Sequence, residues 1–244
     1  MTFDLVVAAV AFLAGIVAAV SGFGIGSLLT PAFALQAGTK AAVAAVAIPH
    51  LVGTAQRFWI LRRHVDRRML LAFGLTSAAG GLLGALAHAW LSSRWLTLVF
   101  GVLLLAAAIA EATGWMARVR WGRRTAWIAG ALSGVFGGLV GNQGSIRSAA
   151  MLGFDVPKES FVATATAIGL FVDGARLPVY LATQWDDIVR QWPLVAAAIV
   201  GVCIGTAVGS RLLERIPRPL FRRIIAGLLF ALGTYMLVAG GIET

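Results

Sequence analysis

The sequence predicts an all-α integral membrane protein with two inverted repeats, each a Gly-broken re-entrant helical hairpin followed by three transmembrane helices. Three observations lead to this prediction. Hydrophobic residues make up 59% of the 244 residues and charged residues only 12%, which is about half the charged fraction of a soluble domain. A glycine-rich interruption of an apolar stretch occurs twice, at corresponding places in the two halves. Basic residues cluster at the ends of apolar stretches, as membrane orientation requires.

The apolar stretches are continuous, which favours α-helices over the alternating strands of an outer-membrane barrel. Crossing a bilayer takes about 20 residues, and the stretches that are long enough are 40–61, 69–91, 95–112, 158–183, 191–212 and 219–241. Shorter stretches flank the two interruptions, at 4–20, 22–36, 126–140 and 145–155. Each of these is either a full span or one half of a re-entrant hairpin. No Lys or Arg precedes the first stretch, so it lacks the basic start of a signal peptide and we expect it to be retained.

The two glycine interruptions, called the first and second break below, indicate an internal repeat. The first is Ser-Gly-Phe-Gly-Ile-Gly at 21–26, and the second is Gly-Gly-Leu-Val-Gly-Asn-Gln-Gly-Ser at 137–145. The halves also align around the breaks, at an offset of 119 for Gly15 with Gly134, Gly22 with Gly141 and Arg57 with Arg176, and at an offset of 121 for Gly80 with Gly201 and Gly84 with Gly205. This alignment predicts a first membrane repeat at 1–112, a basic cytoplasmic linker at 113–125 and a second membrane repeat at 126–244.

The basic residues decide between a hairpin and a single crossing at each break. If each broken element is a hairpin, each half crosses the membrane three times and the basic residues divide 14 against 3. If each is a single crossing, the same residues divide 9 against 8, with no bias. The positive-inside rule therefore favours hairpins and inverted halves, with both termini outside the cytoplasm. The predicted cytoplasmic residues are Arg62, Arg63, Arg67, Arg68, Arg118, Arg120, Arg123, Arg124, Lys158, Arg211, Arg215, Arg218, Arg222 and Arg223; the predicted outer ones are Lys40, Arg94 and Arg190.

Several function classes are disfavoured. The net charge of +10 comes from these membrane-flanking arginines, so we expect no nucleic-acid partner. The single cysteine, Cys203, has no partner within the chain for a disulfide. There is no His-Glu-x-x-His run for a metal enzyme and no Gly-x-x-x-x-Gly-Lys-Ser/Thr run for an ATP-driven pump. We expect neither enzymatic activity nor a metal or cofactor.

The breaks themselves are the first candidate binding elements. Interrupted helices in matching positions of two halves mark the substrate site of many secondary transporters. Glycines in such a break allow the helix to stop and expose backbone N–H groups, and the candidates are Gly22, Gly24, Gly26, Gly141 and Gly144. Neutral hydrogen-bonding side chains accompany them at Asn142, Gln143 and Ser145, and at Gln56 in the first half.

Arginines within apolar stretches are the second group of candidates. A charge at the centre of the membrane costs at least about 2.5–3.5 kcal/mol, so such residues usually face a cavity or a partner. Arg147 follows the second break by three residues, where a helix start and a planar guanidinium both suit an oxyanion. Arg57 either faces the site or snorkels to the cytoplasmic surface. Arg176 either binds the ligand or pairs with Asp173, three residues earlier, and the two roles are compatible.

Titrating groups inside the predicted membrane region are few. Asp173 is the one clear carboxylate there and is the candidate for coupling transport to a proton. A permanent ion pair with Arg176 is the alternative for the same residue. His50 lies in an apolar helix, where a histidine serves more often in packing than as a proton relay.

The two breaks, the length and the hydropathy pattern together resemble the sulfite exporter TauE/SafE family. The resemblance rests on Ser-Gly-Phe-Gly-Ile-Gly-Ser at 21–27 followed by Pro31, on Gly-Gly-Leu-Val-Gly-Asn-Gln-Gly at 137–144, and on coverage of about Leu5 to Gly241. It implies a multi-pass protein of the cytoplasmic membrane that exports sulfite or an organosulfonate. Where the family has a triple-glycine run, this chain has Gly141-Asn-Gln-Gly144, so the resemblance leaves the transported anion open.

We therefore expect a secondary transporter for a small sulfur-containing anion that works by alternating access. An anion channel, a carrier for another small oxyanion or carboxylate, and a membrane subunit without transport of its own are the alternatives. The expected partners are the anion and the lipid bilayer, and a homodimer is compatible with the sequence.

Overall fold

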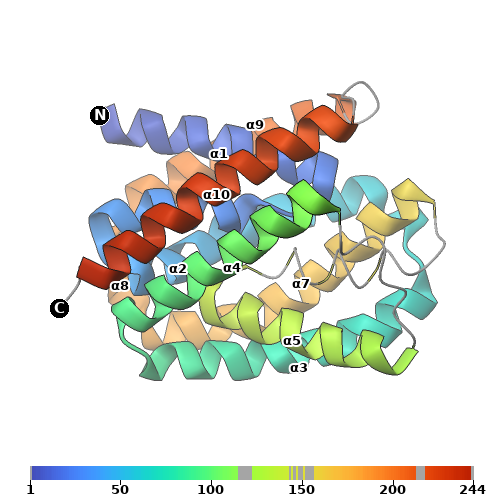
Figure 1. Cartoon of the computed structure of the whole chain (residues 1–244), viewed down its shortest axis with the longest axis horizontal. Coiled ribbons are helices and arrows are strands. Elements are labelled where there is room, and N and C mark those ends of the chain that lie inside the picture. The colour runs from blue at the N-terminus through green and yellow to red at the C-terminus, as the bar shows by residue number, and fades with distance from the viewer. Residues whose placement is uncertain are drawn as a thin grey trace.

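The computed structural model describes residues 2–114, 123–142, 144, 147, 151, 157–212 and 218–242, and these residues form helices and no strand. The prediction of an all-α chain is confirmed for them. The helices, labelled in Figure 1, are α1 (Thr2–Ser21), α2 (Ile25–Leu61), the short 3₁₀ helix η1 (Arg62–His64), α3 (Arg67–Trp90), α4 (Ser93–Thr113), α5 (Arg123–Val140), α7 (Lys158–Thr183), α8 (Trp185–Arg190), α9 (Trp192–Leu212) and α10 (Arg218–Ile242).

Seven of the described helices are long and apolar enough to cross a membrane. They include a helix for each of the six spans predicted from hydropathy, and also α1, whose 20 residues are about 30 Å long at helical rise. The long helices lie side by side along the long axis of the molecule (Figure 1). Their outer faces carry large apolar side chains, as lipid contact requires, including those of Leu75, Leu83, Val102 and Ile204. The chain is thus a membrane protein with several apolar helices.

Helix α2 contains a sharp turn at Gly38, where φ is 73° and ψ is 161°. The chain reverses direction there, because residues on either side of the turn approach each other. A β-carbon built on Gly53 would lie 3.1 Å from Cδ1 of Ile25, and one built on Gly26 would lie 3.8 Å from Cδ2 of His50. Residues 25–37 and 39–61 are therefore two antiparallel segments, in agreement with the gap between the apolar stretches 22–36 and 40–61.

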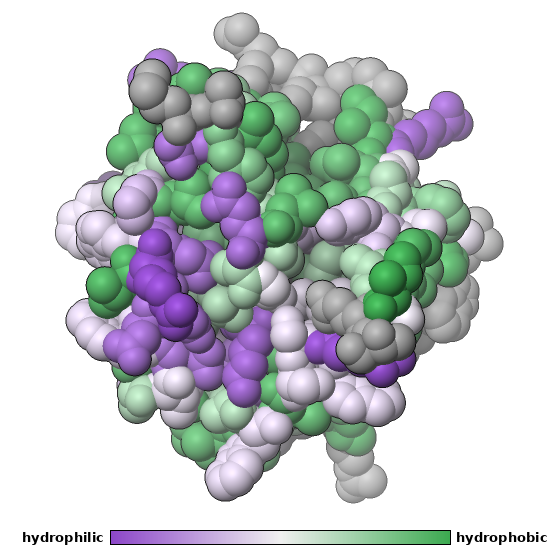
Figure 2. All heavy atoms as spheres, turned by 90° about the vertical axis from the view of Figure 1, so that its left-hand side faces the viewer, coloured by the Kyte–Doolittle hydropathy of each residue, from purple (hydrophilic) through white to green (hydrophobic). Residues whose placement is uncertain are grey.

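Both chain termini lie at one end of the molecule, on the left in Figure 1. The connection between α3 and α4 lies at the same end (Figure 1). The Gly38 turn lies there too, because Lys40 Nζ donates a 2.8 Å hydrogen bond to the carbonyl of Ala89, next to this connection. Arg94 Nε donates to the carbonyl of Gly240 at 3.2 Å, which places the end of α10 there too. Figure 2 views this end of the molecule and shows polar side chains gathered on it among apolar ones. The arginines of η1 and of the start of α3 lie at the opposite end.

The helices of the two halves pack against each other rather than within separate domains. Helix α1 packs against α9, α5 packs against α3, and α4 packs against α10. One buried apolar cluster joins α1, α2 and α9, and another joins α3, α5 and α7. The predicted linker at 113–125 lies mostly outside the described residues, and the boundaries between the repeats stay a prediction.

Glycines allow the close approach of these helix pairs, and they correct one detail of the alignment. A β-carbon on Gly80 would meet the carbonyl oxygen of Ala131, and one on Gly205 would meet that of Phe12. Phe12 and Ala131 are 119 residues apart, the offset that relates α1 to α5. The counterpart of Gly80 is therefore Gly205 and not Gly201. In the same way Gly84 meets Val135 and Gly209 meets Ile16, so Gly209 is the counterpart of Gly84. This part of the alignment was wrong by one helical turn. Glycines repeated every four residues produce this error because they match equally well when shifted by a turn.

Candidate functional site

Each break ends a helix with a glycine in the left-handed conformation. Gly22 follows α1 with φ 84° and donates its N–H to the carbonyl of Ala18 at 2.9 Å. Gly141 follows α5 with φ 74° and donates to the carbonyl of Gly137 at 3.0 Å. Glycine adopts this conformation without steric cost and is the usual residue just after a helix end. The equivalence of Gly22 and Gly141 inferred from sequence therefore extends to their conformations.

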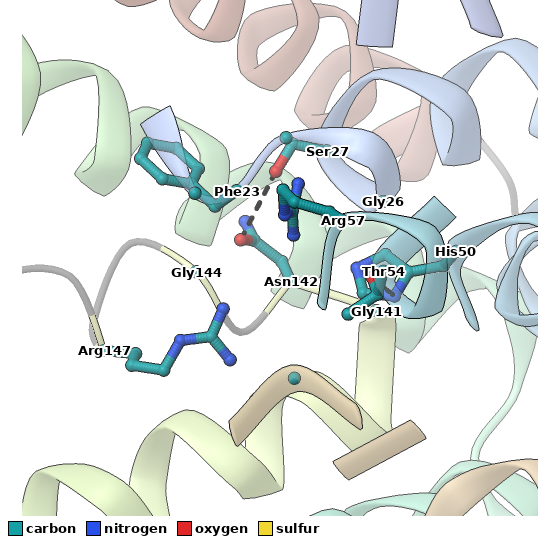
Figure 3. Close-up of a pocket in the computed structure, with 13 residues that line it drawn as sticks. Phe23, Gly26, Ser27, His50, Thr54, Arg57, Gly141, Asn142, Gly144 and Arg147 are labelled. Atoms are coloured by element: carbon teal, nitrogen blue, oxygen red, sulfur yellow. Dashed lines mark hydrogen bonds between the residues drawn. The ribbon is translucent and has the colours of Figure 1, made fainter. Parts of the chain in front are cut away.

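The two breaks meet in the interior of the molecule. Gly26 lies against the carbonyl oxygen of Gly141, and Gly144 lies against the side chain of Phe23. Ser27 Oγ donates a 3.4 Å hydrogen bond to Oδ1 of Asn142, shown as the dashed line in Figure 3. Backbone from both breaks is in direct contact, so whatever lies at this junction touches both halves of the chain.

A small pocket opens at this junction (Figure 3). It is lined by Gly22, Phe23, Gly24, Gly26, Ser27, His50, Thr54, Arg57, Gly141, Asn142, Gly144, Arg147 and Gly169. Eight of the residues predicted for the site are among these: the five glycines of the breaks, Asn142, Arg57 and Arg147.

The charged side chains buried in the described part of the molecule are mostly cationic. Arg57, Arg147 and Arg176 are each at most 3% exposed, and Asp173 is fully buried. The described residues thus bury three guanidinium groups and one carboxylate.

Arg57 points into the pocket from α2. Its Nε donates to Oγ1 of Thr166 at 2.8 Å, and its Nη1 is buried with no hydrogen-bond partner among the described residues. The side chain is 3% exposed, so it does not snorkel to the surface. Asn142 Nδ2 is likewise buried with no such partner. Two donors that line one pocket therefore lack acceptors.

Arg176 lies beside the pocket, behind Gly141, and its donors are used within the protein. Its Nε and Nη2 approach Oδ1 of Asp173 at 3.0 and 2.9 Å, and its Nη1 donates to the carbonyl of Gly137 at 2.9 Å. The carbonyl of Gly138 accepts from Tyr180. A cation and a hydroxyl thus satisfy carbonyls at the end of α5, which the helix itself leaves unpaired.

Two of the predicted site residues are not described, and one lies elsewhere. Gln143 and Ser145 lie outside the described residues. Gln56 does not line the pocket, because its Nε2 donates to the carbonyl of Cys203 on α9 at 3.2 Å.

Sequence reasoning missed several residues that line the pocket. The sequence favours a packing role over a proton relay for His50, and it does not single out Thr54, Gly169 or Phe23 as site residues. His50, Thr54 and Arg57 follow a spacing of four and three residues, which places them on one face of a helix. That spacing was the available signal for His50 and Thr54. Gly169 and Phe23 carry no such signal.

The family model of the sulfite exporter TauE/SafE matches residues 7–236, which is nearly the whole chain. The chain therefore belongs to this family, and the resemblance inferred from the two breaks is confirmed. The family is one of membrane transporters and not of enzymes. No curated protein and no solved structure shows significant similarity to the chain.

Proposed function

We propose that this member of the TauE/SafE family is a secondary transporter that moves a small sulfur-containing anion, such as sulfite or an organosulfonate, across the cytoplasmic membrane by alternating access. One observation carries the proposal. The pocket where the two breaks meet is lined by two buried arginines, Arg57 and Arg147, and by no carboxylate among its described residues. Family membership supports the export of an anion of this kind.

The donors of the pocket suit an oxyanion. Arg57 Nη1 and Asn142 Nδ2 are buried with no partner in the described part of the chain, and leaving a buried donor unsatisfied costs about 1–3 kcal/mol. Sulfite and sulfonate groups present three oxygens, which can accept from several donors at once, and guanidinium matches such groups geometrically. An anion bound between these residues would accept from both donors and pair with the guanidinium of Arg57.

The paths of the two halves support an inverted repeat with the site at its centre. Helix α1 starts at the end of the molecule that carries the termini, and residues 25–37 lead back to that end at the Gly38 turn. Helix α5 starts at the opposite end, because Ala129 packs in one cluster with Met69 and Phe73 near the start of α3. The two breaks therefore enter from opposite sides and meet in the interior. Rocking one half against the other would open the pocket to each side in turn.

The membrane potential supplies a driving force for export. An inside-negative potential favours the outward movement of an anion by about 2.3 kcal/mol per charge per 100 mV. With the arginine-rich end in the cytoplasm and both termini outside, as the positive-inside rule favours, the potential drives outward flux of any substrate that crosses with net negative charge.

Flux measurements in proteoliposomes test the proposal, with sulfite, sulfoacetate, sulfate and chloride as the anions. We expect saturable flux with counterflow for a sulfur oxyanion. A hydrogen bond to a charged group contributes about 1.5–3 kcal/mol, so Arg57→Gln should weaken apparent affinity about ten- to a hundredfold. Arg190→Gln is the control, because Arg190 is exposed on α8 and pairs only with its neighbour Asp187.

Each alternative predicts a different result. Flux without saturation or counterflow would indicate a channel. Equal flux of chloride and the sulfur oxyanions, or an Arg57→Gln variant with unchanged affinity, would contradict the site. Absence of flux for every anion would remove sulfur anions as the substrate class.

A further inference from the structure

His50 links the pocket to the buried ion pair. It lines the pocket from α2, and its Nδ1 lies 2.7 Å from Oδ2 of Asp173 on α7. Oδ1 of the same carboxylate accepts from Arg176. An ionised carboxylate can only accept hydrogen bonds, so the His50 Nδ1 must carry the hydrogen and the Nε2 carries the lone pair. The Nε2 of His50 therefore has a lone pair that can take up a proton, whereas the hydrogen bonds from His50 and Arg176 favour the ionised form of Asp173.

The charges around His50 make its protonation depend on the anion. The ring is influenced by Asp173 and Arg176 from α7 and by Arg57 from its own helix, and Arg147 lines the same pocket. With the pocket empty, the guanidinium groups of Arg176 and Arg57 oppose a positive charge on the ring, and the carboxylate of Asp173 favours it. An anion in the pocket adds negative charge beside the ring and so favours the imidazolium form. The anion and the proton thus stabilise each other's binding, and this coupling is reciprocal.

We propose that His50 binds a proton at Nε2 together with the anion and releases it with the anion, so that each transport cycle moves one proton with the substrate. The proton comes from water on the side where the pocket is open and leaves to water on the other side. Asp173 keeps its negative charge throughout, held by Arg176. This inference rests on the proposed function, because the coupling needs an anion in the pocket.

The test counts the protons taken up when the anion binds to purified full-length protein. The probe is sulfoacetate, because its sulfonate and carboxylate stay ionised near neutral pH, whereas sulfite itself takes up protons there. Calorimetric titrations in buffers of different ionisation enthalpy give the number of protons per anion. His50→Gln keeps an N–H that can donate to Asp173 but cannot titrate. His88→Gln is the matched control, because His88 is also fully buried but donates to the carbonyl of Leu139 and does not line the pocket.

We expect about one proton per anion for the wild type and for His88→Gln. In both proteins the Kd for the anion should rise about tenfold for each unit of increasing pH, as long as His50 is mostly neutral in the empty pocket. His50→Gln should bind the anion with no proton uptake and with a Kd that does not change with pH. Proton uptake retained in His50→Gln, or lost equally in His88→Gln, would overturn the assignment to His50. Anion binding without proton uptake by the wild type would overturn the coupling and leave the proposed function intact. No anion binding by the wild type would overturn both.

Discussion

The contact between Gly26 and Gly141 joins the two breaks, and replacing Gly26 by Ala tests it. A β-carbon at position 26 would overlap the carbonyl oxygen of Gly141 and lie 3.2 Å from its carbonyl carbon. Both partners in this contact are backbone, so no side-chain rotation can relieve the overlap. The two breaks would have to move apart, and the pocket that lies between them would change shape.

The expected cost is large enough to measure. Adding a methyl group to a well-packed interior costs about 1–3 kcal/mol when the surroundings must shift. For a chain of this length each kcal/mol changes Tm by about 2–4 °C, so Gly26→Ala should lower Tm by about 2–12 °C. Gly174→Ala on α7 is the control, because its β-carbon would meet no atom within 4 Å. Alanine is favoured over glycine within a helix by about 0.5–1 kcal/mol, so this variant should match or exceed the wild type.

Thermal unfolding in detergent, followed by intrinsic tryptophan fluorescence, measures both variants, and the flux assay shows whether the pocket is affected. We expect Gly26→Ala to lose both stability and anion affinity and Gly174→Ala to lose neither. A Gly26→Ala variant that unfolds at the wild-type temperature would refute the argument that the two breaks meet through this backbone contact.

Three further predictions follow from the packing. Arg176→Gln leaves Asp173 buried without its cation and should lower the free energy of unfolding by about 3–5 kcal/mol. The double variant Arg176→Gln with Asp173→Asn should recover part of this loss in thermal unfolding, and no recovery would contradict the ion pair. Gly169→Ala, whose β-carbon would lie 3.3 Å from Thr54 at the wall of the pocket, should reduce anion flux; full flux in this variant would place the substrate elsewhere. In a Cys203→Ser background, a cysteine at Ser92 should react with an impermeant thiol reagent added to intact cells, and one at His64 should not; the reverse labelling would invert the predicted orientation.

Hydropathy alone predicted most of the fold, because long continuous apolar stretches have few structures open to them in a membrane. It also predicted the interruption near Gly38 as a gap between two stretches. It did not predict the short helix α8 or η1, which lie between longer helices and have no apolar period of their own. The one-turn error in aligning Gly201 with Gly80 arose because the packing partner of a glycine, Ala131 or Phe12, is set by tertiary contact and not by the local sequence.

The candidate site was predictable where the chemistry is visible in the chain itself. Glycine breaks and arginines in apolar stretches are rare enough to stand out, and eight of the predicted residues line one pocket. The contact of His50 with Asp173 was not predictable, because the two residues are 123 positions apart in the sequence. Gly169 contributes space rather than a functional group, and only the packed structure shows that Thr54 and Arg147 border that space.

The structure separates the two arginines that the alignment made equivalent, and it does so through their neighbours. At the offset that relates Arg57 to Arg176, Thr54 corresponds to Asp173. Asp173 pairs with Arg176 three residues later, and the pair is anchored at the end of α5 through the carbonyl of Gly137. Thr54 offers Arg57 no negative charge, and Nη1 of Arg57 stays without a partner among the described residues at the wall of the pocket. Two arginines thus lie near one junction, and a single difference, Thr54 against Asp173, gives Arg176 a partner of opposite charge and leaves Arg57 the residue that we propose to bind the anion.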